Sequence, residues 1–140
     1  MRLNKQIPQV DLKPFPWRSL KTKGSERCIP LVGVAPWAAR RIVNESREED
    51  FAFPRYCDEV GCSANPASNR LNKWLQQKVS NQFVMHSFRL CLLDRLRLVE
   101  CPTEVVDVIR GWQVATLGQR YGDGYQLEML LAWLMKIKLH

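Results

Sequence analysis

The strongest constraint on the fold is an apolar repeat in the second half of the chain. Four apolar side chains recur at spacings of four, four and three residues: Phe88, Leu92, Leu96 and Val99. This period places them on one face of an α-helix. The repeat predicts a helix from Val84 to about Val99, followed by a shorter helix over 103–110 that Gly111 stops.

Helical patterns also dominate the other segments after residue 33. Further helices are expected over Pro36–Asn44, 68–79, 114–120 and 125–139. The composition of residues 57–67 indicates a loop, and Phe51–Pro54 is expected to be a short buried or extended stretch. Short links join the helices, so residues 33–140 are expected to form one helical part.

The beginning of the chain predicts a small β element. Three prolines in residues 1–17 exclude a long helix there and indicate an irregular extension: Pro8, Pro14 and Pro16. A polar turn around Gly24 and an apolar strand over 28–32 predict a β-hairpin over 18–32. The whole chain, 1–140, is therefore expected to be one α+β domain, mainly helical, in which a β-hairpin packs on a helical bundle.

The charge of the chain favours an anionic partner. Its 140 residues carry a formal net charge of +7, and the isoelectric point is about 9.4. Such a surface suits nucleic acid or an anionic membrane face. Many small basic domains bind nothing in particular, so composition alone does not choose between these alternatives.

Two absences in the sequence indicate a cytoplasmic protein. The N-terminus has no continuous apolar stretch of the kind found in a signal peptide, and the longest apolar run, Met129–Met135, is too short to span a membrane. The five cysteines are then expected to be reduced, buried thiols. Cys57 and Cys62 have no second pair or nearby histidine, so no zinc or other metal site is predicted.

His86 and Arg89 are the first candidates for chemistry. They lie three residues apart on the predicted 84–99 helix, so their side chains share one face. Arginine offers a fork of donors that stays charged, and histidine offers a donor or a proton, so the pair could hold an anionic oxygen. Taken alone, the same pair is more often a half-buried histidine beside a solvated arginine.

Two intervals give this pair a more specific meaning. Trp112, preceded by Gly111, follows Arg89 by 23 residues, and Tyr121 follows Trp112 by nine. With His86, this pattern strongly resembles the C-terminal catalytic block of the tyrosine recombinases, the phage-integrase family. That family has His-x-x-Arg on one helix, then Gly-His or Gly-Trp, then a nucleophilic tyrosine nine residues later. The resemblance covers roughly residues 18–138.

The predicted hairpin extends the resemblance. Its sequence, LKTKGSERCIPL, is similar to the family's β-hairpin, whose lysine approaches the scissile phosphate. Lys21 is the first candidate for this lysine, because it precedes Thr and a basic-x-Ile-Pro strand, and Lys23 is the alternative. Outside this family context, either lysine would be an ordinary solvated turn residue.

The resemblance implies a role for each residue in DNA strand cleavage. Tyr121 would attack a phosphodiester and form a 3′-phosphotyrosyl intermediate, while Arg89 would bind a non-bridging oxygen. His86 would assist with proton transfer or hydrogen bonding, Trp112 would contribute an indole N–H, and Lys21 would protonate the departing 5′-oxygen. The charges come from side chains, so no metal and no cofactor is expected.

The family's second arginine has no counterpart in its usual Thr-Gly-x-Arg-x-x-Glu context. Only Arg2 and Arg18 precede Lys21, and neither lies in such a segment. The sequence therefore predicts an N-terminally truncated catalytic domain of a mobile-element integrase, with impaired activity. The first alternative is a non-catalytic DNA-binding remnant, and a weaker one is a basic helical interaction domain without a DNA role.

The expected partner is double-stranded DNA at an attachment site, and no membrane partner is expected. The candidate phosphate contacts are basic side chains expected to act as a patch: Arg40, Arg41, Lys73, Lys78, Arg95, Arg97 and Arg120. The apolar segment 126–139 is either a core helix or a helix that docks on a neighbouring protomer. By the family resemblance, such docking would form a DNA-dependent homo-oligomer.

Overall fold

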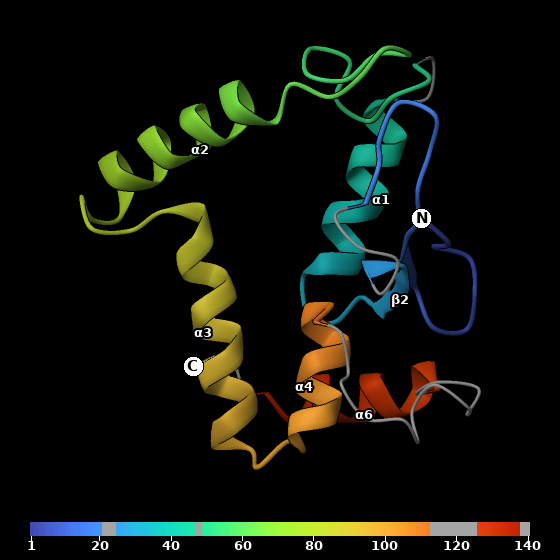
Figure 1. Ribbon diagram of the computed structural model, residues 1–140, viewed down its shortest axis with the longest axis vertical. Helices are drawn as coiled ribbons and strands as arrows, with labels where there is room; N and C mark the ends of the chain where they lie inside the picture. The colour runs from blue at the N-terminus through green and yellow to red at the C-terminus, as the bar shows by residue number, and fades with distance from the viewer. Residues whose placement is uncertain (21–24, 47–48, 113–125, 138–140) are drawn as a thin grey trace.

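The computed structural model describes residues 1–20, 25–46, 49–112 and 126–137 (Figure 1). Within these ranges the chain forms two strands and five helices: β1 (Gln9–Leu12), β2 (Arg27–Pro30), α1 (Ala35–Glu45), α2 (Ala64–Lys78), α3 (Met85–Leu98), α4 (Thr103–Arg110) and α6 (Leu127–Lys136). The prediction of a mainly helical α+β chain is confirmed. None of the described helices is both long enough and apolar enough to cross a membrane.

The two strands correct the predicted hairpin. β1 and β2 pair antiparallel, with Gln9 opposite Pro30 and Leu12 opposite Arg27. The partner of β2 is therefore a strand inside residues 1–17, which were expected to be irregular, and not a segment next to the turn. Pro8 limits helix formation but does not prevent a strand that starts after it. Its carbonyl accepts a hydrogen bond of 2.8 Å from the Leu31 N–H and so extends the pairing.

The helix predictions differ from the structure mainly at their ends. α1, α3 and α4 lie where they were expected, and Gly111 ends α4 with a positive φ of 73°. α2 begins at Ala64, inside the predicted loop, because the first turn of a helix tolerates Pro66. α6 is shorter than 125–139. The predicted helix over 114–120 lies outside the described residues.

The predicted buried stretch at Phe51–Pro54 is also different. Bends and turns replace an extended segment there, and the Phe53 side chain is 54% exposed. The aromatic contact of this region comes from Phe51, whose ring packs edge-on against Trp17 with centroids 5.4 Å apart. The N–H groups of Tyr56 and Cys57 both donate hydrogen bonds to the Phe53 carbonyl, which forms a turn in place of the expected extended stretch.

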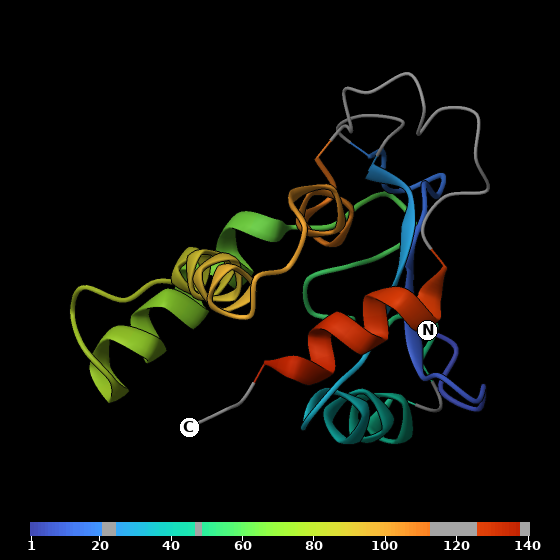
Figure 2. The same ribbon diagram turned by 90° about the horizontal axis from the view of Figure 1, so that it is seen from below.

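The core joins the second half of α3 to α4 and α6. Its buried members come from these helices and the α3–α4 link: Leu96, Cys101, Val105, Val106, Ile109, Leu130 and Leu134. Leu96 from the predicted repeat is completely buried. Burying an aliphatic side chain of this size stabilises the fold by about 1.5–3 kcal/mol. α6 also contacts β2, so the small sheet is attached to the same core (Figure 2).

α2 and the first half of α3 project away from the sheet in both views (Figures 1 and 2). The two helices are joined at the start of α3, where the Met85 N–H donates a 2.7 Å hydrogen bond to Oδ1 of Asn72 on α2. The Val84 N–H donates to the Ser87 hydroxyl. These bonds satisfy helix N–H groups that have no partner within α3. They therefore fix the first turn of α3, on which His86 lies.

Candidate functional site

Two arginines from distant parts of the chain meet at the end of α4. Nη2 of Arg89, on α3, donates a 2.9 Å hydrogen bond to the carbonyl oxygen of Arg110, the last residue of α4. Nη2 of Arg27, on β2, donates to the same oxygen at 3.3 Å. The last carbonyls of a helix lack partners within it and carry partial negative charge, so they attract guanidinium groups. This carbonyl therefore brings Arg27 and Arg89 together.

Gly111 provides the space for Arg27. Its left-handed conformation, with φ at 73° and ψ at 33°, ends α4 and favours glycine. A β-carbon at this position would overlap the guanidinium of Arg27, including Nη2 at 2.8 Å. Nη1 of Arg27 also donates to the Ser25 carbonyl at 2.8 Å. Gly111 thus permits both the left-handed turn that ends α4 and the close approach of the Arg27 guanidinium.

Arg110 adds a third guanidinium, which lies against Trp112. Its Cζ is 3.7 Å from the centroid of the Trp112 ring, an arrangement that attracts a cation to the face of the indole. Arg110 is only 7% exposed, whereas Trp112 is 51% exposed. Nε and Nη1 of Arg110 and Nε of Arg27 are buried and form no hydrogen bond within the described ranges.

The site is strongly cationic. Burial lowers the pKa of Arg27 from its ordinary value, and the charge of Arg89 lowers it further. Burial also lowers the pKa of Arg110, with Arg89 and Arg97 acting in the same direction and Asp107 weakly opposing them. The guanidinium groups nevertheless stay charged at neutral pH. None of the ion pairs among the described residues involves Arg27, Arg89 or Arg110.

The structure brings together two of the five predicted site residues. Arg89 bonds to residue 110, and Trp112 packs on the side chain of that residue. His86 is exposed in the first turn of α3, one turn before Arg89, and forms no hydrogen bond or ion pair with another described residue. Tyr121 and Lys21, with the alternative Lys23, lie outside the described residues.

Arg27 and Arg110 were not predicted as site residues. Arg27 stood in the predicted strand, but the sequence does not indicate that its side chain reaches α4. Arg110 precedes the glycine that ends a helix, a position where a basic residue ordinarily interacts with the helix dipole. The only sequence signal was the density of arginines near the two family-like segments.

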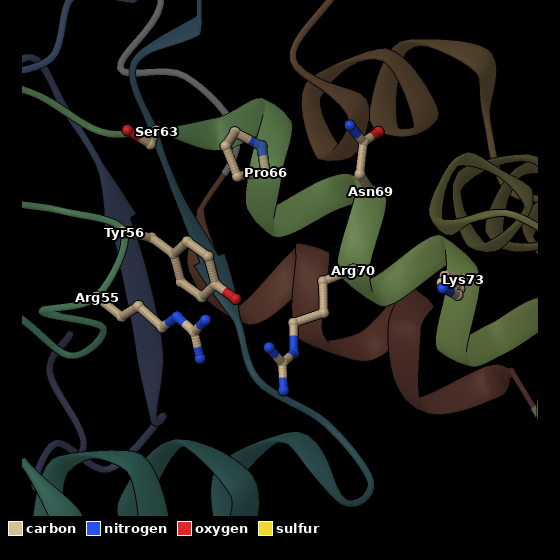
Figure 3. Close-up of a pocket in the computed structure, with 7 residues that line it drawn as sticks. All are labelled: Arg55, Tyr56, Ser63, Pro66, Asn69, Arg70 and Lys73. Carbon is tan, nitrogen blue, oxygen red and sulfur yellow. The ribbon is translucent and has the colours of Figure 1, made fainter.

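A second basic region is an open pocket of about 520 Å³ between the 55–63 segment and α2 (Figure 3). Its lining contains three cations and a phenol: Arg55, Arg70, Lys73 and Tyr56. Figure 3 shows Arg55, Tyr56 and Arg70 reaching into the same space from the two sides. Lys73 is one of the predicted phosphate contacts, and the pocket places it beside two further basic residues.

The cysteines correct another prediction. Cys101 is buried, but Cys28, Cys62 and Cys91 are exposed and Cys57 is half-buried. The Cys57 and Cys62 sulfurs lie 2.6 Å apart, and this contact, with burial, raises the pKa of Cys57 to about 11. The described residues contain no cluster of three or more potential metal ligands.

No protein-family model matches the chain, and searches of curated proteins and of solved structures found no match. The site is therefore interpreted from its own residues and from the sequence pattern.

Proposed function

We propose that this chain is the C-terminal part of a tyrosine recombinase catalytic domain, of the mobile-element integrase type, and that it acts on double-stranded DNA. Tyr121 is the nucleophile and forms a 3′-phosphotyrosyl bond while the 5′-oxygen leaves. The covalent bond conserves the energy of the phosphodiester, so strands can be exchanged without ATP. Arg89 binds the phosphate, His86 and Trp112 assist, and Lys21 is the proton donor to the leaving oxygen.

One observation carries this proposal: Arg89 and the Gly111–Trp112 pair, separated by more than twenty residues, adjoin at one cationic site. The family resemblance requires this juxtaposition, whereas a chance match of motifs does not. The buried guanidinium donors beside it suit the developing charge of a phosphoryl-transfer transition state. The charge of +7 also suits a nucleic-acid partner.

The proposed activity is weaker than that of a chain with both family arginines. Arg2 and Arg18 lie outside the family's arginine context. Loss of one preorganised group that stabilises transition-state charge typically slows a reaction by about 10²–10³-fold. Slow cleavage with intact DNA binding is therefore the expected behaviour.

The second candidate is a DNA-binding protein without cleavage activity. It is favoured by the pocket formed by Arg55, Arg70 and Lys73, which offers positive charge without a role for Tyr121. Both candidates predict DNA binding that weakens steeply with salt, because bound phosphates release counterions. Only the first predicts a covalent product.

Covalent capture distinguishes the two. Nicked duplexes that cover the DNA flanking the reading frame are incubated with the chain, denatured in detergent and separated by size. The enzyme gives a slow protein–DNA adduct that Tyr121→Phe abolishes without changing duplex affinity. Equal adduct formation by Tyr121→Phe, or none by either protein under prolonged incubation, would refute cleavage by this tyrosine.

A DNA-dependent homo-oligomer through α6 is part of the same proposal. Leu130 and Leu134 of α6 are buried in the core, but Met129 and Met135 remain 45% and 66% exposed. These two side chains are the proposed apolar contacts with a neighbouring protomer, on an exposed side of α6 that also carries Glu128 and Lys136. Sedimentation with and without duplex DNA tests the assembly, which Met135→Glu is expected to weaken.

A further inference from the structure

The arginine cluster has more hydrogen-bond donors than it uses. A guanidinium carries five N–H donors, yet Arg89 uses one on the Arg110 carbonyl and Arg27 uses two, on that carbonyl and on Ser25. Nε of Arg27 and two nitrogens of Arg110 are buried without an acceptor in the part of the chain that the structure describes. Buried donors without partners are rare because water can no longer satisfy them. The cluster is therefore incomplete in hydrogen-bonding terms.

The positive charge of the cluster is also not balanced by a carboxylate among the described residues. The positive charge of Arg89 disfavours the charged forms of Arg27 and Arg110, and none of the three has a carboxylate partner among the described ion pairs. A bound anion would reduce this repulsion and could accept the remaining terminal N–H groups of Arg27 and Arg89, which are both half-buried. The geometry of a guanidinium matches the oxygens of a phosphate group, which it can bind through two parallel hydrogen bonds.

We infer that Arg27 and Arg89 together hold one phosphate group at the end of α4. Arg27 supplies a second guanidinium from β2, and Gly111 leaves room for it. Arg110, stacked on Trp112, adds charge behind the pair. The inference rests on the proposed function in taking this phosphate to be a DNA phosphodiester, whereas free inorganic phosphate has the same chemistry.

Two measurements on the full chain test the shared site. The first is the shift in melting temperature produced by inorganic phosphate, relative to chloride at equal ionic strength. The second is the affinity for a short DNA duplex by fluorescence anisotropy. Both are made on Arg27→Gln, Arg89→Gln and the double variant. Lys5→Gln, which removes one exposed positive charge outside the proposed phosphate contacts, is the matched control.

Each substitution at the site is expected to lower duplex affinity by about tenfold or more, as for the loss of a hydrogen bond to a charged group. The double variant loses clearly less than the product of the two single losses, because both side chains bind the same phosphate. Phosphate raises the melting temperature of the wild type and of Lys5→Gln, but not of Arg27→Gln. Arg27→Lys retains the positive charge but not the parallel N–H donors of the guanidinium, so it gives an intermediate result in both measurements.

Three other outcomes would contradict the inference or its assignment to DNA. If Arg27→Gln and Arg27→Lys behave like Lys5→Gln in both measurements, the shared site is wrong, although covalent capture by Tyr121 can still succeed. If the two single losses multiply in the double variant, Arg27 and Arg89 bind different phosphates and the inference fails. If the phosphate shift requires Arg27 but duplex affinity does not, the guanidinium pair binds a free anion and its assignment to DNA is wrong.

Discussion

Gly111→Ala offers a direct measure of how closely Arg27 approaches the end of α4. The left-handed conformation at this position costs a residue with a β-carbon about 1–2 kcal/mol. The added β-carbon overlaps the Arg27 guanidinium, so this side chain must move and lose its bond to the Arg110 carbonyl. A hydrogen bond from a charged group contributes about 1.5–3 kcal/mol. The substitution is therefore expected to lower the free energy of unfolding by about 2.5–5 kcal/mol in total.

A double-mutant cycle separates these two contributions. In an Arg27→Ala background the overlap is absent, so Gly111→Ala should cost only the backbone contribution of about 1–2 kcal/mol. Urea unfolding followed by far-ultraviolet circular dichroism gives the free energies of all four proteins. A smaller cost in the Arg27→Ala background supports the contact, since neighbouring residues are not additive. Equal costs in both backgrounds would refute the close approach of Arg27 to Gly111.

Three further predictions concern the helices and the cysteines. Asn72→Ala should lower the free energy of unfolding by about 1 kcal/mol, because the Met85 N–H loses its acceptor; urea unfolding checks this, and an unchanged midpoint contradicts it. Leu96→Ala should cost about 2–5 kcal/mol in the same assay, because Leu96 is fully buried, and a loss below 1 kcal/mol would place it outside the core. The pKa of Cys57, raised to about 11, keeps its reactive thiolate scarce at pH 8, so iodoacetamide should label it about a hundredfold more slowly than an ordinary thiol. Peptide mass spectrometry should show that the labelling rate of Cys57 continues to rise up to pH 10. At pH 8 this rate should be higher in Cys62→Ser than in the wild type. A Cys57 labelling rate that reaches a plateau near pH 9 would argue against the raised pKa.

The sequence predicts those elements whose signals are local. The apolar repeat of α3 and the glycine that ends α4 each act within one or two helical turns, and both predictions are confirmed. β1 was missed because its partner lies beyond the connecting segment 13–26, and no short turn indicates the pairing. The start of α2 was missed because Asn65–Pro66 is typical of loops, although the first turn of a helix tolerates proline.

The residues of the candidate site could likewise be predicted only where the sequence signal is local. The intervals between His86, Arg89 and Trp112 were visible in the sequence, but the hydrogen bond of Arg89 to the Arg110 carbonyl was not predicted from them. Arg27 could not be identified, because its approach depends on the register of β2 and on the missing side chain of Gly111. Contacts between strand and helix depend on tertiary packing, which local pattern does not encode.

The contact between β2 and α6 affects the order in which the elements can fold while the chain is translated. Two strands alone are at best marginally stable in water, and the helix that covers this pair spans residues 127–136. A ribosome therefore delivers β1 and β2 long before their cover emerges. During synthesis α2 can contact the first half of α3 before residues 127–136 emerge, whereas β1 and β2 must wait for those residues before α6 can cover them.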